Sequence, residues 1–176
     1  LGANRAASGG QQALTFPGMP PIQQAREILA ALRLEGSKFS VDGELIRRLE
    51  RAWGLKVSVA TCKLSGRGLT GMAIQVGDAL VIICPEEGGE ALRGPVIAHE
   101  VAHVVRGDPV IDLDMVTQAL NACPDLPFVI CDPEKELQAE CTAAAIVVLA
   151  RNPDSRFRRA LGRIGAAFFG QIPGSM

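Results

Sequence analysis

The sequence predicts an α+β domain in which a small, three-stranded, mostly antiparallel sheet packs on helices. Segments with apolar residues at helical spacing flank a central stretch, residues 55–84, where short apolar runs alternate with turn residues. Of the 176 residues, 48% are hydrophobic and 4% aromatic, so Ala, Leu, Val and Ile must build the core. No internal repeat is visible. One domain is expected over residues 22–170, with a flexible leader at 1–21 and a tail at 171–176.

Two amphipathic helices are expected before the sheet. After a leader rich in Gly, Ser and Pro, apolar residues recur at helical spacing over residues 22–34, and Gly36 ends the pattern. A second helix is expected over residues 41–53, and Gly54 follows it as a C-terminal cap. Each of these helices is expected to bury one face.

Strands are expected at residues 55–62, 70–76 and 79–84. The dipeptide Gly77-Asp78 separates the second strand from the third, and a two-residue turn of this kind closes a hairpin. The hairpin is the main reason to expect antiparallel pairing in the sheet.

Four further helices are expected after the sheet, and the last of them is rich in Arg. They span about residues 95–106, 113–122, 134–151 and 154–170. The dipeptide Asp132-Pro133 supplies an N-cap and a first-turn proline for the third of these helices.

Composition excludes several classes of protein. A net charge of -1 removes the overall positive field used in non-specific nucleic-acid binding, so no direct nucleic-acid contact is expected. The longest apolar run, residues 143–150, is far shorter than the ~20 residues of a membrane-spanning helix. Residues 1–10 lack the pattern of a secretory signal. A soluble, cytoplasmic protein is therefore expected, with its five cysteines reduced and mostly buried.

Both histidines of the chain lie in one motif, His99-Glu100-Val101-Ala102-His103, within the helix expected after Pro95. Residues four apart on a helix share a face and lie about 6 Å apart, so both imidazoles can bind one metal ion. Glu100 is rotated about 100° from His99 and is suited to act as a general base. The motif predicts a zinc ion that activates water for attack on a carbonyl group. Manganese or iron also suits such a site.

A catalytic zinc site of this kind has three protein ligands, and the chain has no third histidine. The cysteines have no spacing typical of metal ligands, so the third ligand is expected to be a carboxylate. The helix after Pro133 offers Glu134, Glu136 and Glu140. Glu136 and Glu140 remain the two alternatives, and a solvated first helical turn is the simplest interpretation of Glu134.

The stretch Glu136-Leu137-Gln138-Ala139-Glu140 resembles the ligand helix of gluzincins, in which a small residue follows the ligating Glu by three positions and an acid follows it by four. With the H-E-V-A-H motif and the preceding small sheet, residues 45–149 resemble the ImmA/IrrE family of metallo-endopeptidases. The resemblance implies a minimal zincin-like domain with Glu136 as the third ligand. It also implies that Glu140 accepts an N–H from a ligand histidine.

The resemblance further implies a zinc-dependent endopeptidase that cleaves a helix-turn-helix transcriptional repressor, in transcription regulation or a stress response. An extended substrate would then add as a strand to the hairpin, at residues 70–76 or 79–83.

The sequence departs from the family pattern at two points, and the second of them favours an alternative hypothesis. Thr142 stands where the family usually has Phe, and the chain has no Tyr to donate to the developing oxyanion. Arg106, Arg151 and Lys63 are the candidate substitutes, although solvated surface charge is the simpler interpretation of each. The alternative is a metal-binding but catalytically weak or inactive zincin-like sensor or interaction module that regulates a transcription factor.

Overall fold

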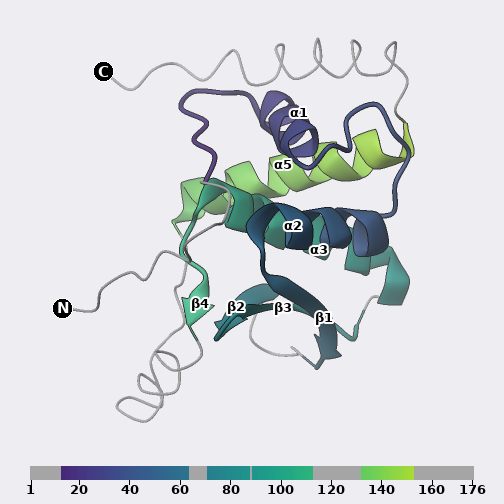
Figure 1. The fold of residues 1–176 in the computed structure, drawn as a ribbon, viewed down its shortest axis with the longest axis vertical. Helices are drawn as coiled ribbons and strands as arrows, with labels where there is room; N and C mark the ends of the chain where they lie inside the picture. The colour runs from purple at the N-terminus through teal and green to yellow at the C-terminus, as the bar shows by residue number, and fades with distance from the viewer. Residues whose placement is uncertain (1–12, 64–70, 88, 113–131, 153–176) are drawn as a thin grey trace, which may run out of the picture.

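The computed structural model describes residues 13–63, 71–87, 89–112 and 132–152 and shows an α+β fold (Figure 1). The helices expected at 113–122 and 154–170, and the tail at 171–176, lie outside the described residues.

The described elements form successive layers around helix α3 (Gly89–Arg106). The sheet lies on one side of α3 and helix α5 (Pro133–Arg151) lies on the other (Figure 1). Helix α1 (Pro21–Ala31) packs on α5. Helix α3 therefore lies at the centre of the fold, which explains why its histidine-bearing segment is largely buried.

The two helices expected before the sheet are present with altered ends. Helix α1 stops at Ala31 because Arg33 adopts a positive φ of 56°, which no α-helix tolerates. The second begins as a turn of π-helix, η1 (Val41–Leu45), and continues as α2 (Ile46–Trp53). Gly54 ends α2 at a φ of 67°, as its capping role predicts.

In the described part of the chain, the sheet contains three strands and a fourth of two residues. Their bounds are Lys56–Cys62 (β1), Met72–Val76 (β2), Ala79–Pro85 (β3) and Ile111–Asp112 (β4). The strands are ordered β1-β3-β2-β4 across the sheet.

The expected hairpin is present, but the prediction of a mostly antiparallel sheet is wrong. Strands β2 and β3 pair antiparallel around Gly77, whereas β1 pairs parallel with β3, and β4 pairs parallel with β2. The apolar strand β3 takes the central position, where it buries Leu80, Ile82 and Cys84. A strand at the centre has two edges to pair, and β1 fills the edge that the hairpin leaves free.

This order also changes the expected place for an extended substrate. Strand β3 is paired along both edges, so strand addition at residues 79–83 is excluded. The outer edge of β2 is paired with β4 at Ile74 and Gln75. Of the stretch 70–76, Thr70 lies outside the described residues.

Helix α3 begins at Gly89, earlier than the expected start at Pro95, which lies inside the helix. Proline lacks an N–H and so removes one hydrogen bond from this first part of α3. The apolar residues that predicted the helix are all buried: Val96, Ile97, Val101, Val104 and Val105. None of the helices in the described part of the chain combines the length and apolar character needed to cross a lipid bilayer.

Part of the expected leader also belongs to the fold. Leu14 and Phe16 pack against the core, and the N–H of Leu14 donates to the carbonyl oxygen of Val105 at 2.9 Å. The sequence predicts a flexible leader up to residue 21. In the structure, residues 13–20 instead contribute apolar side chains, Leu14 and Phe16, that pack against the core.

Helix α5 begins as expected. The Asp132 side chain accepts a hydrogen bond from the N–H of Glu134 at 3.0 Å, and Pro133 occupies the first helical turn. The first turns of α5 carry Glu136, and α5 packs against α3.

Candidate metal centre

Helix α3 brings the two histidines together on one face. The ring centroids of His99 and His103 lie 4.7 Å apart, and the two Nε2 atoms lie 3.0 Å apart. The side chain of His99 is 13% exposed and that of His103 is 8% exposed. The i, i+4 spacing therefore produces the convergence that the motif predicts.

Helix α5 adds the carboxylate of Glu136 to the same point. One oxygen, Oε2, lies 3.1 Å from His99 Nε2, and the other, Oε1, lies 3.3 Å from His103 Nε2. Ligands of a tetrahedral zinc ion at ordinary bond lengths lie about 3.3 Å from one another. The three side chains, which offer ligand atoms within 4.8 Å of one another, form a group that could hold a metal ion.

The two carboxylates left open by the sequence contact opposite sides of one ring. Glu136 faces Nε2 of His99, whereas Oε2 of Glu140 lies 3.2 Å from Nδ1 of the same residue. Glu140 therefore contacts the ring nitrogen that points away from the cluster, the arrangement that the family resemblance implies. Glu134 is exposed and pairs with Gln138 along α5, outside the cluster.

A third acid, Asp108, contacts the site and was not identified from the sequence. Its Oδ2 atom lies 3.0 Å from Nδ1 of His103. Gly107, at a φ of 70°, ends α3 and turns the chain back, so that the N–H of Asp108 donates to the carbonyl oxygen of His103 at 3.0 Å. This hydrogen bond belongs to the Schellman cap, which returns the residue after the glycine to the last turn of the helix.

The signal for Asp108 was present in the sequence. A glycine just after the last apolar residue of a helix indicates a C-terminal cap, and Gly107, four residues after His103, brings the next residue beside that histidine.

Glu100 is buried between α3 and β2, with 7% of its surface exposed. Burial and the nearby negative charge of Glu136 raise its pKa from about 4.5 to about 7, and a hydrogen bond from the backbone N–H of Ala73 opposes this rise. A carboxyl group with a pKa near neutrality is suited to accept and return a proton.

The cations considered as oxyanion donors lie elsewhere. Arg106 is not solvated surface charge, because its side chain is 10% exposed, pairs with Asp108 and donates to Gln138. Its Nε contacts the carboxylate behind His103, on the side of the ring away from Nε2. Lys63 and Arg151 are exposed. Arg106 is therefore engaged with Asp108 and Gln138 in this arrangement.

The described cysteines take no part in the cluster. Cys62, Cys84 and Cys141 are free, and burial raises the pKa of the thiols of Cys84 and Cys141. Cys62 is exposed, which differs from the expectation of mostly buried thiols at this position. Cys123 and Cys131 lie outside the described residues.

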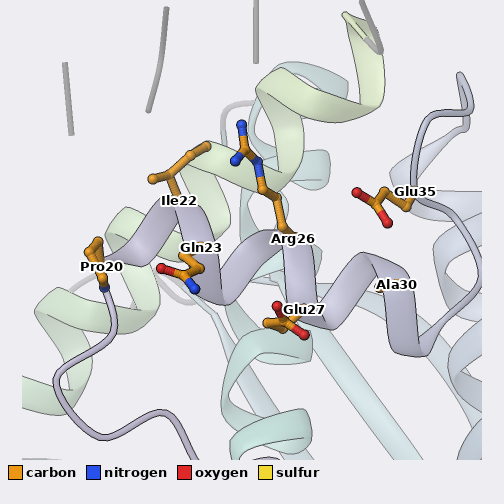
Figure 2. Close-up of a pocket in the computed structure, with 7 residues that line it drawn as sticks. All are labelled: Pro20, Ile22, Gln23, Arg26, Glu27, Ala30 and Glu35. Carbon is orange, nitrogen blue, oxygen red and sulfur yellow. The ribbon is translucent and has the colours of Figure 1, made fainter. Parts of the chain in front are cut away.

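A separate pocket of about 540 Å³ lies along α1 and the segment that follows it (Figure 2). Its lining includes Gln23, Arg26 and Glu27 from the helix and Glu35 beyond it. None of the cluster residues lines this pocket, so it is distinct from the candidate metal centre.

Comparison with known proteins identifies no matching family model, no matching curated protein and no matching solved structure.

Proposed function

We propose that this protein is a zinc-dependent endopeptidase of the gluzincin type, similar to the ImmA/IrrE family, and that its substrate is a protein, specifically a helix-turn-helix repressor. The observation that carries the proposal is the convergence of two Nε2 atoms and the Glu136 carboxylate beside a buried Glu100. The repressor as substrate rests on the family resemblance alone.

His99, His103 and Glu136 would hold the ion, and their donor set of two imidazoles and one carboxylate is typical of catalytic zinc. A bound zinc ion lowers the pKa of water and polarises a peptide carbonyl. Glu100 would take the proton from the attacking water and deliver it to the leaving amine, since it lies next to His99 in the chain and near Glu136 in space.

The decisive test is incubation with the helix-turn-helix regulator encoded beside the gene, with and without chelator. The wild-type protein is expected to make one specific cut that the chelator prevents. Glu100→Gln is expected to abolish this cut and to keep the bound metal, because Gln retains the size of the side chain but cannot accept the proton. The matched control is Glu90→Gln, an equivalent change at an exposed position of α3, which should cleave like wild type.

Cleavage by Glu100→Gln at the wild-type rate would exclude the proposed mechanism. Elemental analysis of the wild-type protein and of Glu100→Gln should find about one zinc per chain in each.

The second candidate function is the metal-binding sensor or interaction module without substantial catalysis. It is favoured by the absence of Tyr from the chain and by the engagement of Arg106 with Asp108 and Gln138. Loss of a single oxyanion donor typically costs on the order of 100-fold or more in rate. A wild-type protein that binds one metal ion and the regulator but does not cut it would favour this second function.

A further inference from the structure

Asp108 is a nearly buried acid with three charged or ionisable partners, His103, Arg106 and Lys135. Its side chain is 9% exposed, and its Oδ2 atom lies 3.0 Å from His103 Nδ1 and 3.2 Å from Arg106 Nε. Its other oxygen, Oδ1, lies 3.7 Å from Lys135 Nζ. A buried carboxylate is costly unless it is paired, and this one has a cation near each oxygen.

The contact with His103 determines which ring nitrogen carries the proton. A carboxylate between two cationic groups is an acceptor only, so His103 Nδ1 must donate to Oδ2. In the neutral ring, the lone pair is then on Nε2. That atom lies 3.0 Å from His99 Nε2 and 3.3 Å from Glu136 Oε1, at the point where the ion would bind.

The same carboxylate joins the two helices that supply the ligands. Arg106 ends α3, and its Nη2 atom donates to Gln138 Oε1 of α5 at 3.1 Å. Lys135 also belongs to α5. Lys135 and Gln138 lie on either side of Glu136 in the sequence. Their contacts with Asp108 and Arg106 therefore hold the first turns of α5 against the end of α3.

The capping geometry makes this arrangement specific. Gly107 places the backbone of Asp108 over His103, and the backbone hydrogen bond of 3.0 Å between the two residues limits where the side chain can reach. Glu140 contacts the other histidine, but its side chain is 74% exposed. Because solvent competes for an exposed carboxylate, Glu140 should orient His99 less strongly than Asp108 orients His103.

We propose that Asp108 is a positioning residue of the metal centre. It holds His103 in the tautomer whose Nε2 can bind the ion, and through Arg106 and Lys135 it sets the position of α5, and so of Glu136, against α3. The inference rests on the metal site of the proposed function but does not require peptidase activity.

The test measures metal affinity and geometry directly. Zinc affinity is measured by competition with a chromophoric chelator, and the visible absorption of the cobalt-loaded protein reports ligand geometry. Asp108→Asn is expected to lower zinc affinity by about 10- to 100-fold and to change the cobalt spectrum, as removal of such an outer carboxylate typically does. Glu140→Gln should lower it less. Asp78→Asn, the same change in an exposed turn, should match wild type in both.

If Asp108→Asn binds zinc with wild-type affinity and gives an unchanged cobalt spectrum, the inference is overturned, and the proposed function is not affected. If wild type binds no metal, the inference and the proposed function both fail. If metal binding depends on Asp108 but no substrate is cut, the inference stands and the peptidase proposal fails.

A second measurement needs no variant and applies if Asp108→Asn does not fold. In the zinc-loaded wild-type protein, long-range ¹H–¹⁵N spectra of the histidine rings report the tautomer. A proton on Nδ1 of His103, protected from exchange, supports the inference. A ring that binds zinc through Nδ1 and carries its proton on Nε2 overturns it.

Discussion

Gly71 immediately precedes β2 and lies against Val96 and Glu100 of α3. A Cβ atom at this position would lie 2.4 Å from Val96 Cγ1 and 3.4 Å from Glu100 Oε1. The first distance is far shorter than a van der Waals contact. The absence of a side chain therefore lets the chain just before β2 approach α3 closely, and two residues further on the N–H of Ala73 donates to Glu100.

Gly71→Ala is expected to destabilise the protein by about 1–3 kcal/mol, because the new methyl group overpacks against Val96. Urea denaturation measures the change in the free energy of unfolding. The control is Gly94→Ala inside α3, where the nearest atom to a new Cβ is Val41 Cβ at 4.0 Å. That change should be neutral or stabilise by about 0.5–1 kcal/mol.

The loss of unfolding free energy caused by Gly71→Ala should be smaller in a Val96→Ala background, because the clashing Cγ1 atom is absent there. Equal destabilisation by Gly71→Ala and Gly94→Ala would contradict this account.

Helices α1 and α5 are joined by a buried polar contact as well as by apolar packing. Thr142 is 0% exposed and Gln24 is 2% exposed. The Thr142 hydroxyl donates to Gln24 Oε1 at 3.4 Å, and Gln24 Nε2 donates to the carbonyl oxygen of Met19 at 2.7 Å. The residue that departs from the family pattern thus has a structural partner in α1.

Thr142→Val keeps the shape of the side chain and removes its donor, which leaves Gln24 Oε1 without this partner. We expect a loss of about 1–3 kcal/mol, the usual penalty for a buried polar atom without a hydrogen bond. Thr61→Val, on the exposed part of β1, should change stability by less than about 0.5 kcal/mol.

In a double-mutant cycle, Thr142→Val combined with Gln24→Leu should cost less than the sum of the two single changes, because both groups share one contact. If the two changes in the free energy of unfolding are strictly additive, the hydrogen bond between Thr142 and Gln24 does not contribute to stability.

At the scale of the whole molecule, the candidate metal centre connects α3, the central helix, with α5. Helix α5 packs on the side of α3 that faces away from the sheet (Figure 1). The ligands come from positions 37 residues apart, as the pairing of His99 with Glu136 shows. A ligand that binds only the folded state stabilises it, so metal binding should stabilise the packing of these two helices and not only the local turn.

Zinc at about 100 times its dissociation constant should stabilise the protein by about 2.7 kcal/mol and raise its melting temperature by several degrees. Thermal unfolding followed by circular dichroism measures the shift. His103→Ala should remove the shift, and Asp78→Asn should retain it, because Asp78 lies in the exposed turn between β2 and β3. A zinc-dependent shift of equal size in His103→Ala would place the metal elsewhere.

Several features could be predicted because they depend on short stretches of chain. The ends of α2 and α5 follow from Gly54 and from Asp132-Pro133, whose capping chemistry is local. The hairpin follows from the turn at Gly77. Likewise, the convergence of His99 and His103 needs only the geometry of one helix.

Other features depend on contacts between distant segments, and local patterns do not specify these. The parallel pairing of β1 with β3 arises because the most apolar strand takes the centre of the sheet. Docking of Leu14 on the end of α3 likewise involves residues far apart in the sequence. Hydrophobic periodicity indicates which face of an element is buried, but not which partner buries it.

The candidate metal centre likewise combines features that the sequence predicts with features that only tertiary packing decides. The sequence alone established the motif and its place on a helix, and it predicted a carboxylate ligand from another element, because the helical repeat and ligand chemistry are local properties. The tertiary packing of α5 on α3 decided that Glu136 faces both Nε2 atoms and that Glu140 faces Nδ1. It also gave Asp108 its partners, because Lys135 and Gln138 reach this end of α3 only when the two helices pack together.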